Sequence, residues 1–335
     1  MINSSALMMG DEGYTISRSV RLRSSASAYF NRTPTSVTNN LKWTWSSWVK
    51  RGAFNAQGLY DGYVSASAFT TLSFYNNALF FYNYVSGVEK ANMITAAVFR
   101  DPSAWYHIVC VYDSANATAA DRLIIYVNGV RQTLTTTTAV GSSDSNYINN
   151  TSASQRLGIR SDVPWYFDGY ITETNFIDGQ ALTPSSFGET NAVTGVWQAK
   201  KYSGTYGTNG FYLNFSDNSS NTATTIGKDY SGNGNNWTPN NISVTAGTTY
   251  DSMLDVPTMW ADGGNGRGNY AVLNPVSKIP STGTATNSAG NLQYVGATTG
   301  STANGFNASI GISSGKFYWE VAVTTGASGE DRKST

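Results

Sequence analysis

The sequence predicts an all-β sandwich. Short apolar runs with period-two alternation recur along the chain, and clusters of Gly, Asn, Ser and Thr separate them. Apolar spacing of the helical kind is almost absent. The clearest signal lies at 105–112, where apolar side chains occupy both faces, as in a strand that is covered on both sides. A second run at 122–127 follows, and Asn128-Gly129 marks a tight turn after it.

The expected strands follow one another with short gaps. The alternation in the early Trp-rich run breaks at Ser46-Ser47, where we expect a β-bulge. A chain of 335 residues is long enough to bury a sizeable core between such strands. The strands are expected at 14–22, 28–31, 41–50, 59–64, 70–75, 78–85, 92–99, 105–112, 122–127, 155–159 and 167–176.

The composition excludes several classes of function. Charged residues make up 13% of the chain, with 21 Lys and Arg against 21 Asp and Glu. Nucleic-acid binding needs a stripe of basic side chains, and attraction to a membrane needs a basic cluster. This neutral, charge-poor composition offers neither, so we expect no nucleic acid partner and no membrane insertion. The only cysteine, Cys110, lies in an apolar run and is expected in the core. The N-terminus lacks a basic start and a long apolar run, so we expect no signal peptide.

Two segments resemble a known family. Trp-Tyr-His-Ile-Val at 105–109 with Leu-Ile-Ile-Tyr-Val-Asn-Gly at 123–129, and Phe-x-Gly-x-Ile-x-Glu at 167–173, are similar to laminin G-like, concanavalin A-type domains. The resemblance covers residues 14–188 and implies a concanavalin A-like antiparallel β-sandwich, a jelly roll. More narrowly, the segment 19–51 looks like jelly-roll domains of tailed-bacteriophage structural proteins.

Four parts are expected along the chain. They are an N-terminal arm at 1–13, the laminin G-like jelly roll at 14–188, a Gly/Asn-rich extension packing on the sandwich at 189–258, and an additional β segment at 259–335. The last part has expected strands at 306–312 and 315–323. Because its Gly-Lys-Phe-Tyr-Trp-Glu-Val run looks like an early SPRY-type strand, it is expected to be a partial C-terminal sandwich.

Catalytic residues are not apparent. A glycosidase of this fold needs paired acids on one strand face. Asp168 and Glu173 are an odd number of residues apart, which places them on opposite faces of a regular strand, and Asp178 and Glu320 are isolated. His107, the only histidine, lies in an apolar strand and is expected to be a packed structural residue. The sequence therefore predicts a protein that is not an enzyme.

The metal that the resemblance implies is Ca²⁺, held at the rim of the sandwich by Asp and Asn oxygens. No other cofactor is expected. The favoured alternative is that these residues close turns, because the 12-residue calcium-loop pattern is missing. The candidates are Asp217, Asp229, Asn233 and Asn235, with Asp168 and Asp178 as a second set.

Sugar binding needs exposed aromatic rings beside polar side chains. Trp43, Trp45 and Trp105 lie in strands and are expected in the core. The expected glycan-binding residues, all in loops, are Trp165, Tyr166, Tyr147 and Trp237.

These observations favour a surface structural or adhesion protein of a bacteriophage virion that binds host-surface glycans or other virion proteins. We expect it to be assembled in the host cytoplasm and to form a homo-oligomer, a trimer in an appendage. A capsid decoration or head-fibre protein without sugar binding is the alternative. A polysaccharide-cleaving enzyme is the third hypothesis.

Overall fold

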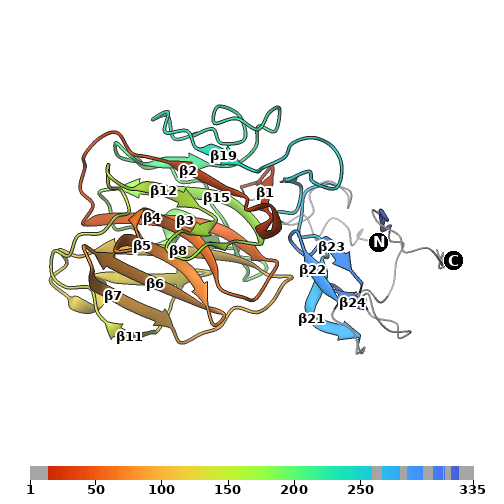
Figure 1. Ribbon diagram of the computed structural model, residues 1–335, viewed down its shortest axis with the longest axis horizontal. Helices are drawn as coiled ribbons and strands as arrows, with labels where there is room; N and C mark the ends of the chain where they lie inside the picture. Colours follow the sequence, from red (N-terminus) through yellow and green to blue (C-terminus); the bar gives the residue numbers. More distant parts are fainter. Residues whose placement is uncertain are drawn as a thin grey trace.

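Two large antiparallel sheets packed face to face form the body of the molecule (Figure 1). The computed structural model describes residues 14–258, 266–279, 285–296, 305–311, 313 and 318–323. The predicted arm at 1–13 lies outside the described residues. The predicted all-β sandwich is confirmed, and its two sheets have the jelly-roll arrangement.

Each large sheet contains eight strands, and every neighbouring pair is antiparallel. Sheet A has the order β10 (Val130–Arg131), β9 (Leu123–Val127), β8 (Trp105–Asp113), β3 (Lys42–Arg51), β15 (Gly169–Asp178), β1 (Ser19–Leu22) and β20 (Ser252–Met253), and β18 (Phe211–Leu213) also pairs with β15. Sheet B has the order β11 (Leu134–Thr138), β7 (Val88–Thr95), β6 (Ala78–Val85), β5 (Ala68–Tyr75), β4 (Gln57–Ser65), β12 (Ser154–Leu157), β2 (Tyr29–Arg32) and β19 (Thr238–Asn240).

The remaining elements are short. The two-stranded pairs are β13 (Ile159–Arg160) with β14 (Trp165–Tyr166), β16 (Gly188–Thr190) with β17 (Trp197–Ala199), β21 (Leu273–Ile279) with β24 (Gly305–Ala308), and β22 (Thr286–Ser288) with β23 (Gln293–Val295). Three single-turn helices are η1 (Ser24–Ala26), η2 (Ala119–Asp121) and η3 (Pro184–Ser186). None of the described helices is long and apolar enough to cross a membrane.

Aromatic rings fill the space between the two sheets. Trp45 of β3 stacks on Tyr60 of β4 with ring centroids 6.0 Å apart, which joins sheet A to sheet B. Trp43 stacks on Tyr112 at 5.4 Å, and both rings are buried. Burying a large apolar side chain contributes about 1.5–3 kcal/mol, so this layer is a principal source of stability.

The strand β8 is covered on both faces, as its sequence predicts. Ile108 and Cys110 point into the core between the sheets, whereas Val109 and Val111 pack on the outer side against Phe187. Residues C-terminal to β15, among them Trp197 and Val256, provide most of this outer layer, and Ile16 before β1 joins it. Sheet A is therefore sealed on both sides, and sheet B keeps a more open outer face.

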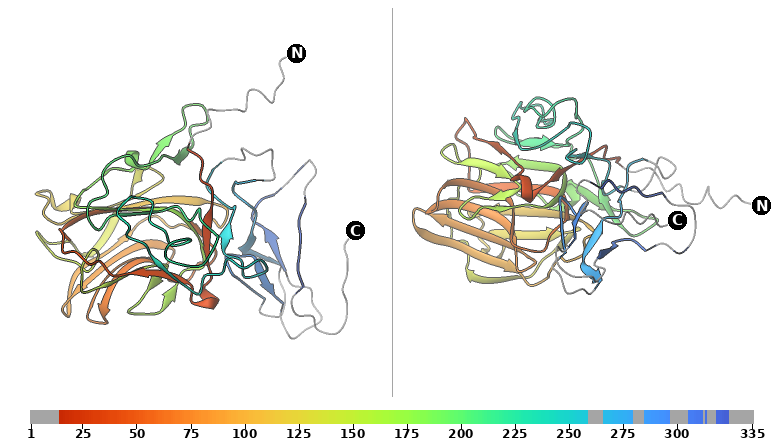
Figure 2. Two further views of the ribbon diagram at one scale, coloured as in Figure 1. Left: turned by 90° about the horizontal axis from the view of Figure 1, so that it is seen from above. Right: turned by 45° about the vertical axis from the view of Figure 1, so that its right-hand side comes forward.

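The extension at 189–258 completes both sheets. Its strands β18 and β20 join sheet A beside β15 and β1, and β19 joins sheet B beside β2. Both views of Figure 2 place β21 to β24 outside the sandwich, on the side where β1 lies in Figure 1.

The β-bulge expected at Ser46-Ser47 is located on the neighbouring strand instead. The pairing of β3 with β8 runs without a shift, but β15 shifts register between Thr172 and Asn175. Glu173 at this shift has a φ of 50°, a left-handed conformation that is uncommon outside glycine. The apolar pattern breaks near Ser46 because Trp48 faces the outer apolar layer rather than the core.

The C-terminal expectations are met in part. The strand β24 covers the first residues of the range predicted at 306–312. The prediction of a strand at 315–323 is wrong over its described part, because residues 318–323 have no strand structure and Tyr318 and Trp319 are 86% and 72% exposed. Residues 315–317 lie outside the described residues.

Candidate functional site

A groove lined by aromatic side chains lies on the outer face of sheet B. Leu72 of β5 and Phe81 of β6 point into the core, so the residues that alternate with them face outward. This alternation places five rings on two neighbouring strands. They are Phe69 and Tyr75 on β5 and Phe80, Tyr82 and Tyr84 on β6.

The rings form a continuous surface. Tyr82 stacks on Phe80 with centroids 5.6 Å apart and on Tyr84 at 6.0 Å. Phe69 of β5 lies 5.6 Å from Tyr82, which joins the two strands. Phe80, Tyr82 and Tyr84 are half-buried, so part of each ring remains accessible. The volume of the groove is about 560 Å³, within the range of small-ligand sites.

The hairpin formed by β13 and β14 closes one side of the groove. Its Trp165 stacks on Tyr75 with centroids 5.8 Å apart and planes 9° apart. The backbone of the hairpin lies directly on Gly58 of β4, where an added Cβ would be 1.9 Å from the Arg160 nitrogen. Glycine at this position therefore permits the hairpin to lie against the sheet.

Arg160 of the hairpin reaches into the aromatic surface. Its guanidinium lies 4.6 Å from the ring centroid of Trp165 and 5.6 Å from those of Phe80 and Tyr82. Its Nε and one Nη donate to the two carboxylate oxygens of Asp162, each at 2.8 Å. Stacking and this bidentate pair fix the guanidinium as a donor beside the rings.

The hairpin also covers polar side chains of the sheet. Asp61 of β4 and Thr71 of β5 are direct cross-strand neighbours, and Ser73 lies two residues beyond Thr71. All three are buried, and Asp61 Oδ1, Thr71 Oγ1 and Ser73 Oγ have no hydrogen-bond partner among the described residues. Burial raises the pKa of Asp61 to about 7, against the opposing effect of Ser161, whose backbone N–H donates to Oδ2 at 2.7 Å.

The groove combines the two chemistries that a sugar ring requires. Half-buried aromatic faces offer a surface for the C–H groups of a pyranose, and Asn92, Arg160 and Asp162 at its margin offer hydrogen-bonding groups. Residues 24–186 match the family model of the concanavalin A-like lectin/glucanases superfamily. The matched residues span the groove, and the fold is a concanavalin A-like jelly roll.

Solved structures with related folds include three that differ widely in source. A heptameric SAP-like pentraxin from Limulus polyphemus is 12% identical, with 50% of this chain and 78% of that chain covered and a TM-score of 0.36. Domain 4 of AbnA, a GH43 extracellular arabinanase from Geobacillus stearothermophilus, in complex with arabinotriose, is 21% identical, with 44% and 65% covered and a TM-score of 0.34. Domains LG4-5 of the mouse laminin alpha1 chain are 12% identical, with 52% and 45% covered and a TM-score of 0.36. A search of curated proteins finds no match.

The four glycan-binding candidates from the sequence are distributed unequally over the concanavalin A-like sandwich. Trp165 lines the groove, whereas Tyr166 beside it packs near Tyr29, with centroids 6.3 Å apart. Tyr147 is half-buried and does not line the groove. The prediction for Trp237 is wrong, because this side chain is fully buried in the core, 4.7 Å from the ring of Phe211.

The calcium candidates Asp217, Asp229, Asn233 and Asn235 form turns. Asp229 accepts hydrogen bonds on both oxygens, from the Tyr212, Ser231 and Asn235 N–H groups and the Ser231 hydroxyl, each at 2.8 Å. Asp217 accepts from Ser219, and the amides of Asn233 and Asn235 both donate to the Gly210 carbonyl. Both oxygens of Asp229 thus face protein donors, which leaves this carboxylate in a turn rather than at a cation, as the turn-closing alternative expects.

Asp168 and Asp178, the second set of calcium candidates, accept hydrogen bonds from neighbouring loops. Asp168 accepts from the Ser24 hydroxyl at 2.9 Å and from the Gly290 N–H at 2.6 Å. Asp178 accepts from the side chain of Asn149 at 2.7 Å and from the Asn209 N–H at 3.0 Å. Among the described residues, no group of three or more His, Cys, Asp or Glu is placed to hold a metal ion.

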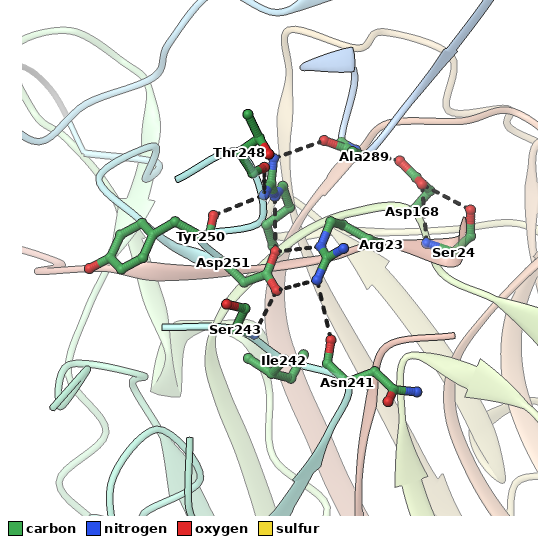
Figure 3. Close-up of polar contacts among 12 residues, drawn as sticks. Arg23, Ser24, Asp168, Asn241, Ile242, Ser243, Thr248, Tyr250, Asp251 and Ala289 are labelled. Atoms are coloured by element: carbon green, nitrogen blue, oxygen red, sulfur yellow. Dashed lines mark hydrogen bonds and ion pairs between the residues drawn. The ribbon is translucent and has the colours of Figure 1, made fainter. Parts of the chain in front are cut away.

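A buried carboxylate that the sequence did not single out, Asp251, lies at the junction of the extension and β1. Asp251 accepts from Arg23 at 2.8 Å, from Arg21 at 3.1 Å and from the Ser243 N–H at 2.8 Å (Figure 3). Its side chain is 0% exposed. This cluster attaches the extension to the first strand of the sandwich, because both arginines lie in or directly after β1.

Two buried titratable residues are held in the body of the fold. His107 is 1% exposed; its Nδ1 accepts from Trp197 Nε1 at 3.0 Å, which leaves Nε2–H to donate to Ser46 Oγ at 2.8 Å. Burial lowers the pKa of His107 to about 3, and the expectation of a packed histidine is confirmed. Glu173 accepts from the Tyr212 hydroxyl at 2.8 Å, and burial raises its pKa to about 7. Glu173 and Asp168 therefore accept hydrogen bonds from different groups, and these contacts do not bring the two carboxyl groups together as a pair.

Arg160 and the tyrosines of β6 were not predicted as site residues from the sequence. A signal for the tyrosines was present, because Phe80, Tyr82 and Tyr84 occupy alternate positions and therefore share one strand face. Phe81, which lies between them in the sequence and faces the core, obscured this pattern. The position of Arg160 over these rings depends on the way the hairpin folds back, which no local pattern predicts.

Proposed function

We propose that this chain binds carbohydrate without cleaving it, and that the aromatic groove on sheet B is the binding site. The observation that carries the proposal is the continuous row of half-buried rings beside the fixed guanidinium of Arg160. The match of residues 24–186 to a superfamily of lectins and glucanases supports it.

A sugar ring would stack on Tyr82 and Tyr84, and its hydroxyls would bond to Arg160, Asp162 and Asn92. Such stacking contributes about 0.5–1.5 kcal/mol for each ring beyond the area that it buries. Hydrogen bonds to charged groups contribute about 1.5–3 kcal/mol each. The sum suits selective binding of an oligosaccharide of a few units.

Glycan-array screening followed by calorimetry tests the proposal. We expect at least one glycan to bind, and Tyr82→Ala to weaken that binding by about tenfold, which corresponds to about 1.4 kcal/mol. Trp165→Ala removes the side wall and is expected to weaken it similarly. Tyr147→Ala is the matched control, since its ring lies outside the groove, and it should bind as the unmodified chain does. Equal effects of all three substitutions would place the binding site elsewhere.

The absence of cleavage is part of the same proposal. Asp168, Glu173 and Asp178 are buried and each accepts hydrogen bonds from neighbouring protein groups. We expect no release of reducing sugar from any polysaccharide that binds. Release that Glu173→Gln abolishes would overturn this part and establish the enzyme hypothesis.

We further propose that the chain acts on the surface of a bacteriophage virion. The support is the resemblance of residues 19–51 to phage jelly-roll domains and a composition poor in charge with a single cysteine. Antibody labelling of purified virions in electron micrographs tests it. Label at a tail appendage supports an adhesion protein, label on the capsid together with an empty glycan array supports the decoration alternative, and absence from virions contradicts both.

A further inference from the structure

A buried lysine on the outer face of sheet A is held in an unusual environment. Lys50 lies near the end of β3, is 0% exposed, and its Nζ makes three short contacts. These contacts are to Asp255 Oδ2 at 2.8 Å, to Asn269 Oδ1 at 2.8 Å and to the Tyr270 carbonyl at 2.7 Å. An amine, a side-chain amide and a carboxyl group therefore meet at one point.

The surroundings of the three side chains are largely apolar. Trp105 donates its indole N–H to Asp255 Oδ1 at 3.0 Å, and the ring centroid of Tyr170 lies 5.7 Å from the lysine nitrogen. Both rings belong to a buried apolar cluster with Val256. The amide of Asn269 is oriented by its own N–H group, which donates to the Ser103 carbonyl at 2.7 Å.

Burial changes the ionisation of the pair in the direction of neutral forms. It lowers the pKa of Lys50 and raises the pKa of Asp255, although their mutual attraction opposes both shifts. Transfer of one proton from the ammonium group to the carboxylate gives a neutral amine and a carboxylic acid. A neutral lysine amine is a nucleophile.

We propose that Lys50 and Asn269 join covalently, forming an intramolecular isopeptide bond between β3 and the segment that follows the extension, with Asp255 as the proton carrier. The amine nitrogen lies within hydrogen-bond distance of Asn269 Oδ1, and the carbon that it attacks, Cγ, is one bond beyond that oxygen.

The reaction balances without any further reagent. The Nζ–Cγ bond forms and the Cγ–Nδ2 bond breaks. Asp255 takes a proton from the lysine nitrogen and delivers a proton to the leaving Nδ2, so its own protonation state is restored. One amine and one primary amide become one secondary amide, and one ammonia is released. Asn269 is only half-buried, which gives the ammonia a route to solvent.

The bond would relieve an energetic cost of the fold. A buried ammonium group loses its hydration, and the ion pair with Asp255 offsets this loss only in part. A neutral amide removes the charge and retains a polar group for the Tyr270 carbonyl. It also closes a covalent loop between residues 50 and 269, which restricts the unfolded chain as a disulfide does.

Mass spectrometry of the full chain, denatured after storage in its folded state, tests the proposal. We expect the mass to be lower than the sequence mass by one ammonia. Trypsin should then release the peptides 43–51 and 268–278 as one linked species, because cleavage after a modified lysine is blocked. The linked species is essential, since cyclisation at an Asn-Gly pair also releases ammonia.

Variants separate the chemistry from the fold. Asn269→Ala and Lys50→Arg should each show their full sequence mass and unfold at lower temperature, whereas Lys42→Arg, at the more exposed ion pair with Asp113, should retain the link. If the chain without substitutions is folded and shows its full sequence mass, the proposal is overturned. A loss of one water, with the link at Asp255, would overturn the assignment to Asn269. The mass of the chain without substitutions decides the question, so the test remains decisive even if a variant misfolds.

Discussion

The contact between Gly58 and the hairpin of β13 and β14 provides a direct test of the groove. In Gly58→Ala the new Cβ would lie 1.9 Å from the Arg160 nitrogen and 2.0 Å from the carbonyl carbon of Ile159. Both contacts are to backbone atoms, so no side-chain rotation relieves them. We expect the hairpin to move away from sheet B.

The cost of this movement can be estimated from the contacts that it breaks. Separation of Trp165 from Tyr75 loses a stacked pair worth about 0.5–1.5 kcal/mol. Withdrawal of Arg160 from the rings loses about 0.5–2 kcal/mol. Hydration of Asp61 Oδ1, Thr71 Oγ1 and Ser73 Oγ returns part of this free energy, because these atoms have no hydrogen-bond partner among the described residues. We expect a net fall of about 1–3 kcal/mol in the free energy of unfolding, similar to other overpacked sites.

Urea unfolding and limited trypsin digestion measure the two effects. Arg160 is 8% exposed in the closed hairpin, so cleavage after it should be slow in the unmodified chain and fast in Gly58→Ala. Gly311→Ala is the control, because an added Cβ there has open space around it. Equal stability and equal digestion of Gly58→Ala and the unmodified chain would refute the close packing of the hairpin and its role in forming the groove.

Three further predictions concern buried charges. Between about pH 4.5 and 7 the folded chain retains the Glu173 proton that the unfolded chain releases, so the free energy of unfolding falls as the pH rises through this window. Urea unfolding at pH 4.5 and pH 7 should show that this fall is smaller by about 3 kcal/mol in Glu173→Gln. An equal fall in the two chains would contradict the pKa of about 7. The NMR signal of His107 should not shift between pH 8 and 5, because its pKa of about 3 keeps the ring neutral; a midpoint near 6.5 would contradict its burial. Asp251→Ala leaves Arg21 and Arg23 without their shared carboxylate and should lower the free energy of unfolding by about 3–5 kcal/mol, measured by urea unfolding, whereas an unchanged value would show that the cluster contributes no stability.

The sequence predicted those features that depend on a local pattern. Apolar residues on both faces of 105–112 required cover on both sides, and the structure provides it through two separate apolar clusters. The turn at Asn128-Gly129 is also local, and Asn128 has the positive φ that such turns require.

Features that depend on distant segments were beyond local patterns. Trp237 follows a Gly/Asn-rich turn and therefore resembles a surface residue, but β19 directly after it pairs with β2, and this places the ring in the core. The bulge opposite Ser47 lies in β15, more than 100 residues later in the chain, so the sequence of β3 alone does not indicate which strand carries it. The aromatic groove likewise depends on β6, β5 and a returning hairpin meeting on one face.

The pairing of β1 and β2 has a consequence for synthesis of the chain on the ribosome. Their partners are β15 and β20 for β1, and β12 and β19 for β2, so the first strands made wait for residues more than 100 positions later. During that interval β1 and β2 remain without their sheet partners, and unpaired strand edges are templates for aggregation. Slowing elongation after residue 32 should therefore lower the soluble yield, and binding of a chaperone to residues 19–32 should restore it.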